Sequence, residues 1–532
     1  MWGCNSSPDA RSFNNGGNRS FNNDDNCSFN NGDNRSFNND DNRSFNNGDN
    51  RSFNHGFCDD FGDAKRPPPN NYIPDVRSIE ELYKEDVEHA ESYRLIVEDD
   101  DDIRISGDNI NQFVMMDTWQ SAGFDGILLK NVVERSMYIR PRKIQAFVIP
   151  VVMEGRDVKG HAETGSGKTA AFMLPIIQML LRRPRQETKP LSKPSPRAII
   201  IEPTRELCSQ VYEQGRKLAY ETGIKVAKAY GQYKMHANLN ELNAGCDILC
   251  ATPGRLKHFI SANLISVDEV EFLVLDEADT LLEANFLDDI RVIVGAPNFP
   301  DMNSRQTMLF SATFPEQVQA LSNDVLKPDC VFVSNQKLVA ANSRVIQKFE
   351  HVQQNDKKHR LLEVLMHEME EQKKTNPNGP ELCRTLVFVR TKRDADLVSL
   401  FLVEHQIKAS TINGDRSQKL REQALRDFRN NFIHVLVSTD VCARGIDIKD
   451  LDHVINMDLP NDAVTYVHRI GRTGRLKMGK ATSFFDDTDP VDMNIAKKLV
   501  EFVRDVDQEV PDFLQRAIGF GTSHYEQPSS DW

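Results

Sequence analysis

The stretch from Gly160 to Phe172, GHAETGSGKTAAF, contains the residue types of a phosphate-binding loop. Its glycines let backbone N–H groups approach an anion, Lys168 offers an ammonium to the outer phosphates, and the Thr169 hydroxyl can bind Mg²⁺. The preceding VIPVVMEGRD predicts a short apolar strand and a turn, and the following AAFMLPIIQMLLRR predicts a helix with basic residues in its last turn. A chance match is the alternative, because Ala162 stands where the general pattern has Gly. The strand, loop and helix order favours a nucleotide site.

Two carboxylates follow a later apolar run, FLVLDEAD. Asp276 is placed to hold Mg²⁺ through water, and Glu277 to orient and deprotonate the water that attacks the γ-phosphate. The alternative is that the two carboxylates are ordinary surface residues without a catalytic role. The pair, however, follows the phosphate loop in the order that an NTPase requires. A kinase would need an acceptor-binding lid and a GTPase an Asn-Lys-x-Asp base reader, and the sequence contains neither pattern. We therefore predict an NTPase.

A third motif near the C-terminal end, YVHRIGRTGR, has arginines at three-residue steps. Arginine fingers stabilise charge in the transition state and contribute about 10³ to 10⁵ in rate. Arginines supplied from a second lobe would make hydrolysis depend on closure of the two lobes, so the free energy would drive domain motion. A plain phosphate-backbone patch is the alternative interpretation.

Length and composition limit the class of protein. The 532 residues allow two or three domains, and 39% hydrophobic with 27% charged residues is typical of a soluble globular protein. A net charge of −14 argues against a protein that coats nucleic acid by charge alone. No run of 18 apolar residues and no secretory signal occur, so we expect a soluble intracellular protein. The nine cysteines lack a Cys-x-x-Cys pair and suit reduced thiols, and we expect Cys246 and Cys250 to be core residues.

An eight-residue unit recurs six times from Arg11, beginning RSFNNGGN and ending RSFNHGF. Each unit is too short for a solenoid repeat, and Phe is its only large apolar residue type, which predicts a disordered low-complexity N-terminal tail. A calcium-binding β-helix is not favoured, because its period is nine residues and it needs an aliphatic position. Weak self-association of the tract and an inert spacer both stay open.

After the proline-rich KRPPPNNYIP, apolar strands alternate with helical patterns in two series. The first contains RAIIIEP, DILCATP, VEFLVLDEAD and TMLFSAT, and the second RTLVFVRT, KASTING, HVLVSTD, HVINMDLP and GKATSFF. Such alternation is typical of an α/β fold whose parallel sheets have helices on both faces. We predict a repeat tail at 1–66, a linker and acidic segment at 67–112, domains at 113–335 and 345–515 with a hinge between them, and a tail at 516–532.

The ordered set of motifs from Phe113 to Leu514 resembles the DEAD-box ATP-dependent RNA helicases, and within them most closely the Vasa group. The motifs that carry the resemblance are YIRPRKIQ, AETGSGKT, PTREL, TPGR, DEAD, SAT, VFVRTK, QKLR, STDVCARGID and HRIGRTGR. The resemblance implies two tandem RecA-like domains, ATP and Mg²⁺ as cofactors, and RNA held by its backbone without sequence preference. It implies an RNA-dependent ATPase that opens short duplexes locally or remodels ribonucleoprotein.

The resemblance also assigns site residues. The catalytic groups are Lys168, Asp276, Glu277, Arg472 and Arg475, with Thr169 and Asp276 at the metal. The nucleotide contacts are Trp119, Gln145 as adenine reader, Ala162, Glu163, Thr164, Gly165, Ser166, Gly167, Lys168, Thr169 and Asp447 at the ribose. The RNA-backbone contacts are Thr204, Arg205, Thr252, Gly254, Arg255, Thr391, Arg421 and Thr439. Ser311 and Thr313 would couple hydrolysis to strand separation.

The chain departs from the family pattern at four places. Pro141, Arg142 and Lys143 replace Pro-Thr-Pro, Gly231 and Gln232 replace Gly-Gly, Asn413 and Gly414 replace His-Gly, and Glu163 replaces a Gln. None of these removes a catalytic group. They bear on nucleotide affinity and on strand bending.

Two other function classes remain to be distinguished from the helicase. The first is an ATP-gated RNA clamp and granule scaffold with little productive unwinding, and the second is a DNA translocase of the same superfamily. The resemblance to the Vasa group implies a location in cytoplasmic germ granules, perinuclear in part, and small-RNA pathway proteins as partners. It also implies a monomeric catalytic core and no membrane association. The RNA targets, the protein partners and the organismal role are not encoded in any motif.

Overall fold

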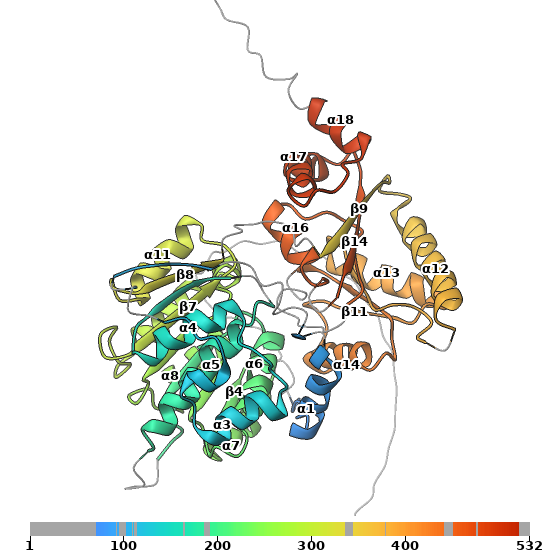
Figure 1. Ribbon diagram of the computed structural model, residues 1–532. Coiled ribbons are helices and arrows are strands. Elements are labelled where there is room, and N and C mark those ends of the chain that lie inside the picture. Colours follow the sequence, from blue (N-terminus) through green and yellow to red (C-terminus); the bar gives the residue numbers. More distant parts are fainter. Residues whose placement is uncertain are drawn as a thin grey trace, which may run out of the picture. The chain divides into compact units, whose positions relative to one another are not determined.

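The computed structural model of the chain describes residues 71–91, 93–94, 103–108, 110, 114–162, 165–185, 192–335, 344–377, 379–440, 451–474 and 477–520 (Figure 1). Several predictions lie outside these residues. They concern the octapeptide tract, the acidic run 98–102, most of the hinge 335–344, and the site residues Glu163, Thr164, Asp447 and Arg475. The described residues belong to one compact unit.

The first sheet has eight strands in the order β1-β8-β2-β7-β6-β3-β5-β4. All of its pairs are parallel except β1 with β8, which is antiparallel. The strands are β1 Ile103–Ser106, β2 Val158–His161, β3 Ala198–Ile201, β4 Val226–Ala229, β5 Ile248–Ala251, β6 Phe272–Leu275, β7 Gln306–Ser311 and β8 Val331–Asn335. We call this sheet and its helices the first lobe.

Helices cover both faces of the first sheet. In β3, Ala198 and Ile200 pack into one apolar cluster with α4 (Lys143–Met153) and α5 (Lys168–Arg182). Ile199 and Ile201 pack into another cluster with α8 (Pro253–Ser261) and α11 (Glu316–Val325). Because successive strand residues point to opposite faces, a strand that is buried on both faces is apolar throughout. The helices are α1 Ile79–Glu88, α3 Gly126–Lys130, α4 Lys143–Met153, α5 Lys168–Arg182, α6 Arg205–Leu218, α7 Met235–Asn243, α8 Pro253–Ser261, α9 Ala278–Glu283, α10 Leu287–Val294 and α11 Glu316–Val325, with short turns η2 Trp119–Ala122 and η3 Asn131–Arg135.

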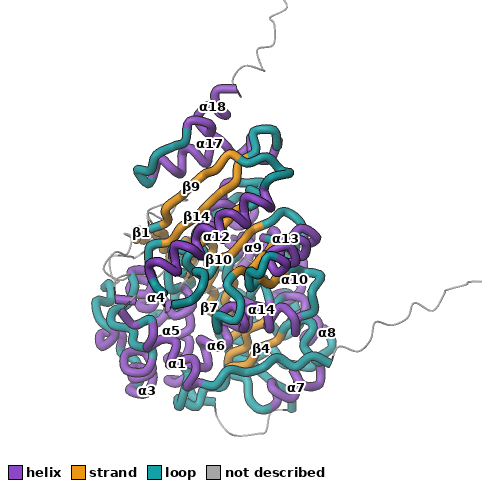
Figure 2. The backbone as a smooth tube through the Cα atoms, turned by 90° about the vertical axis from the view of Figure 1, so that its right-hand side faces the viewer, coloured by secondary structure: helices purple, strands orange, loops and turns teal. Residues whose placement is uncertain are grey.

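The second sheet has six strands in the order β11-β12-β10-β13-β14-β9, and every pair is parallel. Figure 2 shows its strands running between helices. The strands are β9 Val345–His351, β10 Thr385–Phe388, β11 Ala409–Ile412, β12 Val435–Ser438, β13 His453–Asn456 and β14 Gly479–Phe485. The helices are α12 Lys357–Thr375, α13 Lys392–Glu404, α14 Gln418–Arg429, α16 Ala463–Ile470, α17 Pro490–Asp505 and α18 Asp512–Phe520. This sheet and its helices form the second lobe, and the predicted α/β class with two parallel sheets is confirmed.

The strand predicted immediately before the phosphate loop is wrong. VIPVV lies inside α4, and the strand that leads into the loop is β2, with the sequence VKGH. In α4 seven of the eleven residues are buried, so its sequence is apolar on nearly all sides and carries little helical periodicity. A short apolar run of this kind cannot be assigned to helix or strand by periodicity alone.

The first sheet also begins earlier than the segment predicted as its domain. β1 precedes Phe113 and pairs with β8, so part of the predicted linker is a strand of the sheet. Cys246 and Cys250 are buried in the two clusters of the first lobe, as expected. Among the helices that the structure describes, none is both long and apolar enough to cross a membrane.

Candidate functional site

The phosphate loop joins the end of β2 to the start of α5. Gly165 and Gly167 have φ angles of 87° and 96°, which L side chains rarely adopt. A Cβ on Gly167 would lie 2.6 Å from Gln145 Nε2, so a side chain there would clash as well. Backbone N–H groups at the N-terminus of α5 lack partners within the helix and favour an anion. Ser166 Oγ is buried without a hydrogen bond among the described residues, as expected of a group that meets phosphate.

Lys168 is the first residue of α5 and lies at the centre of the site. Its Nζ donates to Glu277 Oε1 at 3.0 Å and to the Ala162 carbonyl at 3.2 Å, and lies 3.7 Å from Asp276 Oδ1. The ammonium is buried, yet the nearby carboxylates raise its pKa above the usual value. Lys168 is therefore a fixed positive charge at the loop.

Asp276 and Glu277 follow β6 directly. Glu277 has a φ of 49°, a left-handed conformation that is uncommon for a non-glycine residue and is often found at functional sites. Burial raises the pKa of the Asp276 carboxyl, against the opposing charge of Lys168. Burial also disfavours the ionised form of Glu277, but Lys168, and beyond it His468 and Arg472, lower its pKa below the usual range. Glu277 is thus kept as a carboxylate, which a general base must be.

His468 and Arg472 belong to the second lobe, at the end of α16 and just after it. Arg472 is buried, and its Nε donates to the His468 carbonyl at 3.0 Å. The effect of both residues on Glu277 places positive charge of the second lobe near the carboxylates of the first. The sequence reasoning identified Arg472 and missed His468, which lies in the same HRIGRTGR motif.

Asp279 is another residue that the sequence reasoning did not select. Its Oδ2 accepts hydrogen bonds from the backbone N–H and the hydroxyl of Thr313, each at 3.0 Å. Its backbone N–H donates to Ser311 Oγ at 3.1 Å. The last residue of DEAD therefore joins α9 to the Ser-Ala-Thr turn after β7, whose Ser311 and Thr313 are expected to couple hydrolysis to strand separation. The sequence offered one indication of this role, because Asp279 lies three residues after Asp276 and in the first turn of α9.

Gln145 and Arg142 lie against the phosphate loop. Gln145 Oε1 accepts from the Arg142 backbone N–H at 2.9 Å, and its Nε2 donates to the Gly167 carbonyl at 3.1 Å. Arg142 Nη1 donates to the Gly165 carbonyl. Trp119, by contrast, is only 1% exposed and packs against Phe124 and Tyr138 in the core of the first lobe. Because the Trp119 ring is buried, the predicted contact with the nucleotide would require this side chain or its neighbours to move.

The candidate RNA contacts gather at the carboxyl ends of parallel strands, where ligands bind in open α/β sheets. Each predicted threonine and the glycine follow a strand or begin a helix there. Thr204 and Thr391 accept hydrogen bonds as the N-caps of α6 and α13, and Thr252 precedes α8. A Cβ on Gly254 would have only Asp289 within 4 Å, so its backbone is open to close approach. Thr439 directly follows β12.

Arg255 has the surroundings of an anion-binding group. Its Nη2 donates to the Tyr233 carbonyl at 2.8 Å, while Nη1 is buried without a hydrogen bond in the described part of the chain. Burial and the like charge of Arg205 lower its pKa. A phosphate would relieve both costs, because it supplies negative charge and acceptors. These residues therefore fit a nucleic-acid backbone.

Arg421 is engaged within the protein. Its Nη2 donates to Glu206 Oε2 at 2.7 Å, and both side chains are buried. Glu206 lies in α6 of the first lobe and Arg421 in α14 of the second, so the pair joins the lobes. For Arg421 to contact RNA as predicted, it would have to use its other terminal nitrogen, Nη1, or release Glu206.

Four carboxylates surround Lys168, including one that no motif identified. Glu202 follows β3, is fully buried, and has no hydrogen bond to either carboxylate oxygen among the described residues. Burial, and then the charges of Asp276 and Glu277, raise its pKa well above the usual value. The negative charge of Asp279 also raises the pKa of Lys168. Among the described residues no group of three or more His, Cys, Asp or Glu side chains is arranged to hold a metal ion, so Mg²⁺ here would need oxygen ligands from a bound nucleotide and water in addition to Asp276 and Thr169.

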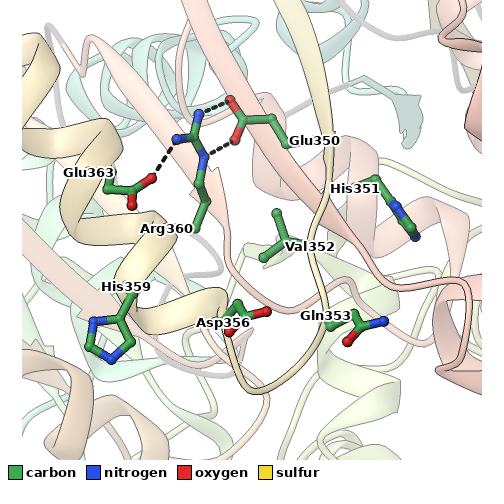
Figure 3. Close-up of a pocket in the computed structure, with 8 residues that line it drawn as sticks. All are labelled: Glu350, His351, Val352, Gln353, Asp356, His359, Arg360 and Glu363. Atoms are coloured by element: carbon green, nitrogen blue, oxygen red, sulfur yellow. Dashed lines mark hydrogen bonds and ion pairs between the residues drawn. The ribbon is translucent and has the colours of Figure 1, made fainter.

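A hollow of about 790 Å³ on the second lobe lies between the end of β9 and α12, and no predicted site residue lines it (Figure 3). Figure 3 shows Arg360 held between Glu350, at 2.6 Å, and Glu363, at 2.7 Å. Because its guanidinium is neutralised by two carboxylates, this hollow offers little attraction to a phosphate.

Comparisons with known proteins agree with this geometry. Residues 142–321 match the family described as DEAD/DEAH box helicase, and residues 356–477 match the helicase conserved C-terminal domain. A probable ATP-dependent RNA helicase DDX4 of Pelophylax lessonae is 40% identical over 81% of this chain and 58% of its own length. The ATP-dependent RNA helicase DDX4 of Mus musculus is 42% identical over 75% of this chain and 55% of its own. The chain thus spans somewhat more than half the length of these curated relatives.

Solved structures are similar over most of the chain. Dbp5 of S. cerevisiae bound to RNA and ADP BeF3 has a TM-score of 0.62 and 26% identity, over 75% of this chain and 99% of its own. The DEAD-box helicase Mss116 bound to ssRNA and UDP-BeF has a TM-score of 0.63 and 25% identity, over 77% of this chain and 83% of its own.

Proposed function

Because the chain belongs to the DEAD/DEAH box helicase family and is similar to DDX4 members of it, we propose that it is an ATP-dependent RNA helicase. It would bind the RNA backbone, hydrolyse ATP when the lobes close, and open short duplexes or remodel ribonucleoprotein. The observation that carries the proposal is the buried ion pair of Lys168 and Glu277, in which Lys168 lowers the pKa of Glu277 and His468 and Arg472 of the other lobe lower it further.

ATP with Mg²⁺ would supply the phosphoryl group whose transfer to water releases the free energy. The amides of Gly165 and Gly167 and the Lys168 ammonium would bind its phosphates, and Thr169 and Asp276 would hold the cation. Glu277 would orient a water and accept its proton, because its neighbours keep it ionised. Arg472 would stabilise negative charge at the transferred group, which makes hydrolysis depend on the second lobe.

Asp279 supports coupling of that reaction to RNA. Its bonds to Ser311 and Thr313 connect α9, which begins at the catalytic pair, with the turn after β7. Hydroxyls, a glycine turn and arginines at strand ends suit phosphate and 2′-OH groups, and such contacts read no base sequence.

The test compares ATPase stimulation by single-stranded RNA and by DNA of the same sequence, followed by strand separation of a short RNA duplex. We expect RNA to stimulate and DNA not to, with phosphate release in step with strand separation. Stimulation by DNA would identify a translocase, and phosphate release without separation would favour the RNA clamp and scaffold.

The similarity to the two DDX4 proteins supports a further proposal on cellular role. We expect the protein in cytoplasmic germ granules, perinuclear in part, with small-RNA pathway proteins as partners and a monomeric catalytic core. Imaging of the tagged protein in germ cells tests this, and uniform distribution through the cell would contradict it.

A further inference from the structure

Residues 71–78, which precede α1, touch both lobes. The Tyr72 carbonyl accepts a hydrogen bond from the backbone N–H of Lys234 in the first lobe, at 2.8 Å. The Tyr72 hydroxyl donates to Glu422 in α14 of the second lobe. Asp75 Oδ2 pairs with Arg426 Nη2 of the same helix at 2.6 Å. This segment was predicted as part of a linker, yet it bridges the two lobes.

The segment and the helix after it are fixed to the first lobe. The Arg77 carbonyl accepts from Arg216 Nη1 at 2.8 Å, and the Tyr83 hydroxyl donates to the Lys217 carbonyl at 2.7 Å. Asp86 forms an ion pair with Lys217 in which both side chains are buried. Tyr72 and Asp75 therefore reach α14 from a support that belongs to the first lobe.

Gln232 makes a third contact with α14. It lies in the first lobe with a φ of 66°, where the resembled family has glycine. Its Oε1 accepts from the backbone N–H of Gln418, the first residue of α14, at 3.1 Å. The first N–H groups of a helix have no partner within the helix, so Gln232 satisfies one of them from the other lobe.

Glu422 collects donors from both lobes. Its Oε1 accepts from Tyr230 of the first lobe and from Gln418 of its own helix, each at 3.1 Å, in addition to the Tyr72 bond. Burial and then the bond to Glu422 raise the pKa of Tyr72, so its hydroxyl keeps the proton that it donates. Hydrogen bonds to a charged acceptor contribute more than neutral ones.

From these contacts we infer that Tyr72, Asp75 and Gln232 are positioning residues that hold α14 on the first lobe and so raise the affinity for RNA. We call the three side chains the α14 clasp. The inference rests on the proposed function. Its reason is that α14 also carries Arg421, bound to Glu206, and Gln418, whose Oε1 accepts from Arg205 at 3.3 Å. Fixing α14 therefore brings RNA-backbone groups of both lobes together.

The test uses the full chain and a charge exchange. Asp75→Arg and Arg426→Asp each place like charges opposite one another, so each should raise the RNA concentration for half-maximal ATPase about two- to fivefold. The double variant restores an ion pair and should return close to the parent value. The maximal rate should change little, because no clasp residue touches the nucleotide site. A matched control is Asp324→Arg, which breaks an ion pair with Arg291 inside the first lobe, 3.3 Å long; it should leave the RNA requirement unchanged.

Two substitutions test the hydrogen bonds separately. Gln232→Gly suits the positive φ, so it should not strain the loop, and it should raise the RNA requirement about two- to tenfold. Tyr72→Phe keeps the ring and should have an effect of similar size. Lobe closure is read independently from energy transfer between dyes at the exposed positions Val292 and Leu400, with RNA and a non-hydrolysable ATP analogue. The closed fraction should fall in each single variant.

The clasp is overturned if the single variants keep the parent RNA requirement and closed fraction, or if the charge exchange fails to restore them. A parent protein whose ATPase ignores RNA would instead refute the proposed function. In that case the energy transfer, measured with the nucleotide analogue alone, still decides whether the clasp holds α14.

Discussion

Lys168 Nζ and Glu277 Oε1 form a buried hydrogen bond of 3.0 Å between the phosphate loop and the residue after β6. The bond joins the cation expected to meet the outer phosphates to the carboxylate expected to accept a proton from water. The same contact lowers the pKa of Glu277 against the effect of burial. Lys168 therefore sets the protonation state of the candidate base as well as the charge of the loop.

Glu277→Gln should abolish most hydrolysis while RNA binding with ATP persists. The amide keeps the size of the side chain but cannot accept a proton, and general-base catalysis contributes about 10² to 10⁴ in rate. The measurements are single-turnover hydrolysis and RNA affinity with ATP. The control is Glu283→Gln, at the exposed C-terminal end of α9, the helix that begins directly after Glu277. Parent-like hydrolysis by Glu277→Gln would refute the assignment.

Arg472→Ala should reduce RNA-stimulated hydrolysis far more than ATP binding without RNA. The first lobe holds most of the nucleotide before closure, whereas a finger acts on the transition state and contributes about 10³ to 10⁵ in rate. Nucleotide titration and turnover measure the two effects. Because Arg472 is buried, the melting temperature should be compared with that of the parent. Equal losses of binding and turnover would mean that Arg472 belongs to a preformed site.

Arg142→Thr should change the Michaelis constant for ATP several-fold and the turnover number less. The guanidinium donates to the Gly165 carbonyl, so it braces the phosphate loop and does not act on the reacting atoms. Steady-state kinetics of the variant and of Arg140→Thr, an exposed neighbour, separate bracing from a general loss of charge. An unchanged Michaelis constant would show that the bond is dispensable.

Glu202→Gln should stabilise the nucleotide-free protein, and more so as pH rises. The pKa of Glu202 is raised in the folded state, so folding favours its protonated form. As pH rises above about 4.5, the unfolded state loses this proton first, and the parent loses stability at up to about 1.4 kcal/mol per pH unit until the folded pKa is reached. The amide does not titrate. Chemical denaturation at pH 5 and pH 8 measures the difference, and a margin that shrinks with pH would contradict the prediction.

Replacement of Phe13, Phe21, Phe29, Phe37, Phe45 and Phe53 by Ser should disperse the protein from granules and leave RNA-stimulated ATPase nearly intact. Each aromatic can stack on a base or meet an arginine for about 0.5 to 3 kcal/mol, and six on one tether act together. Imaging and ATPase assays on the same variant test both halves. Granules that survive would favour an inert spacer, and a loss of ATPase would mean that the tract contacts the lobes.

The sequence by itself determined the class of fold and most of the candidate site. Parallel strands buried on both faces are apolar throughout, and their carboxyl ends share one edge, so polar motifs after β3, β5, β6 and β7 must gather there. The positions of Gly165 and Gly167 indicate a phosphate loop, because its turns need positive φ angles that only glycine adopts without strain. These features depend on local geometry and on strand order.

Only the tertiary structure decided which groups meet across the chain. Apolar VIPVV became helix because α4 is buried on nearly all sides, which removes the periodicity that distinguishes helix from strand. Trp119 is buried in the core, Thr313 donates to Asp279, and Glu202 is buried close enough to Asp276 and Glu277 for their charges to raise its pKa. Tertiary packing, and not spacing along the sequence, determines these neighbours. Tyr72 reaches Glu422, 350 residues away, and no local pattern specifies a partner at that separation.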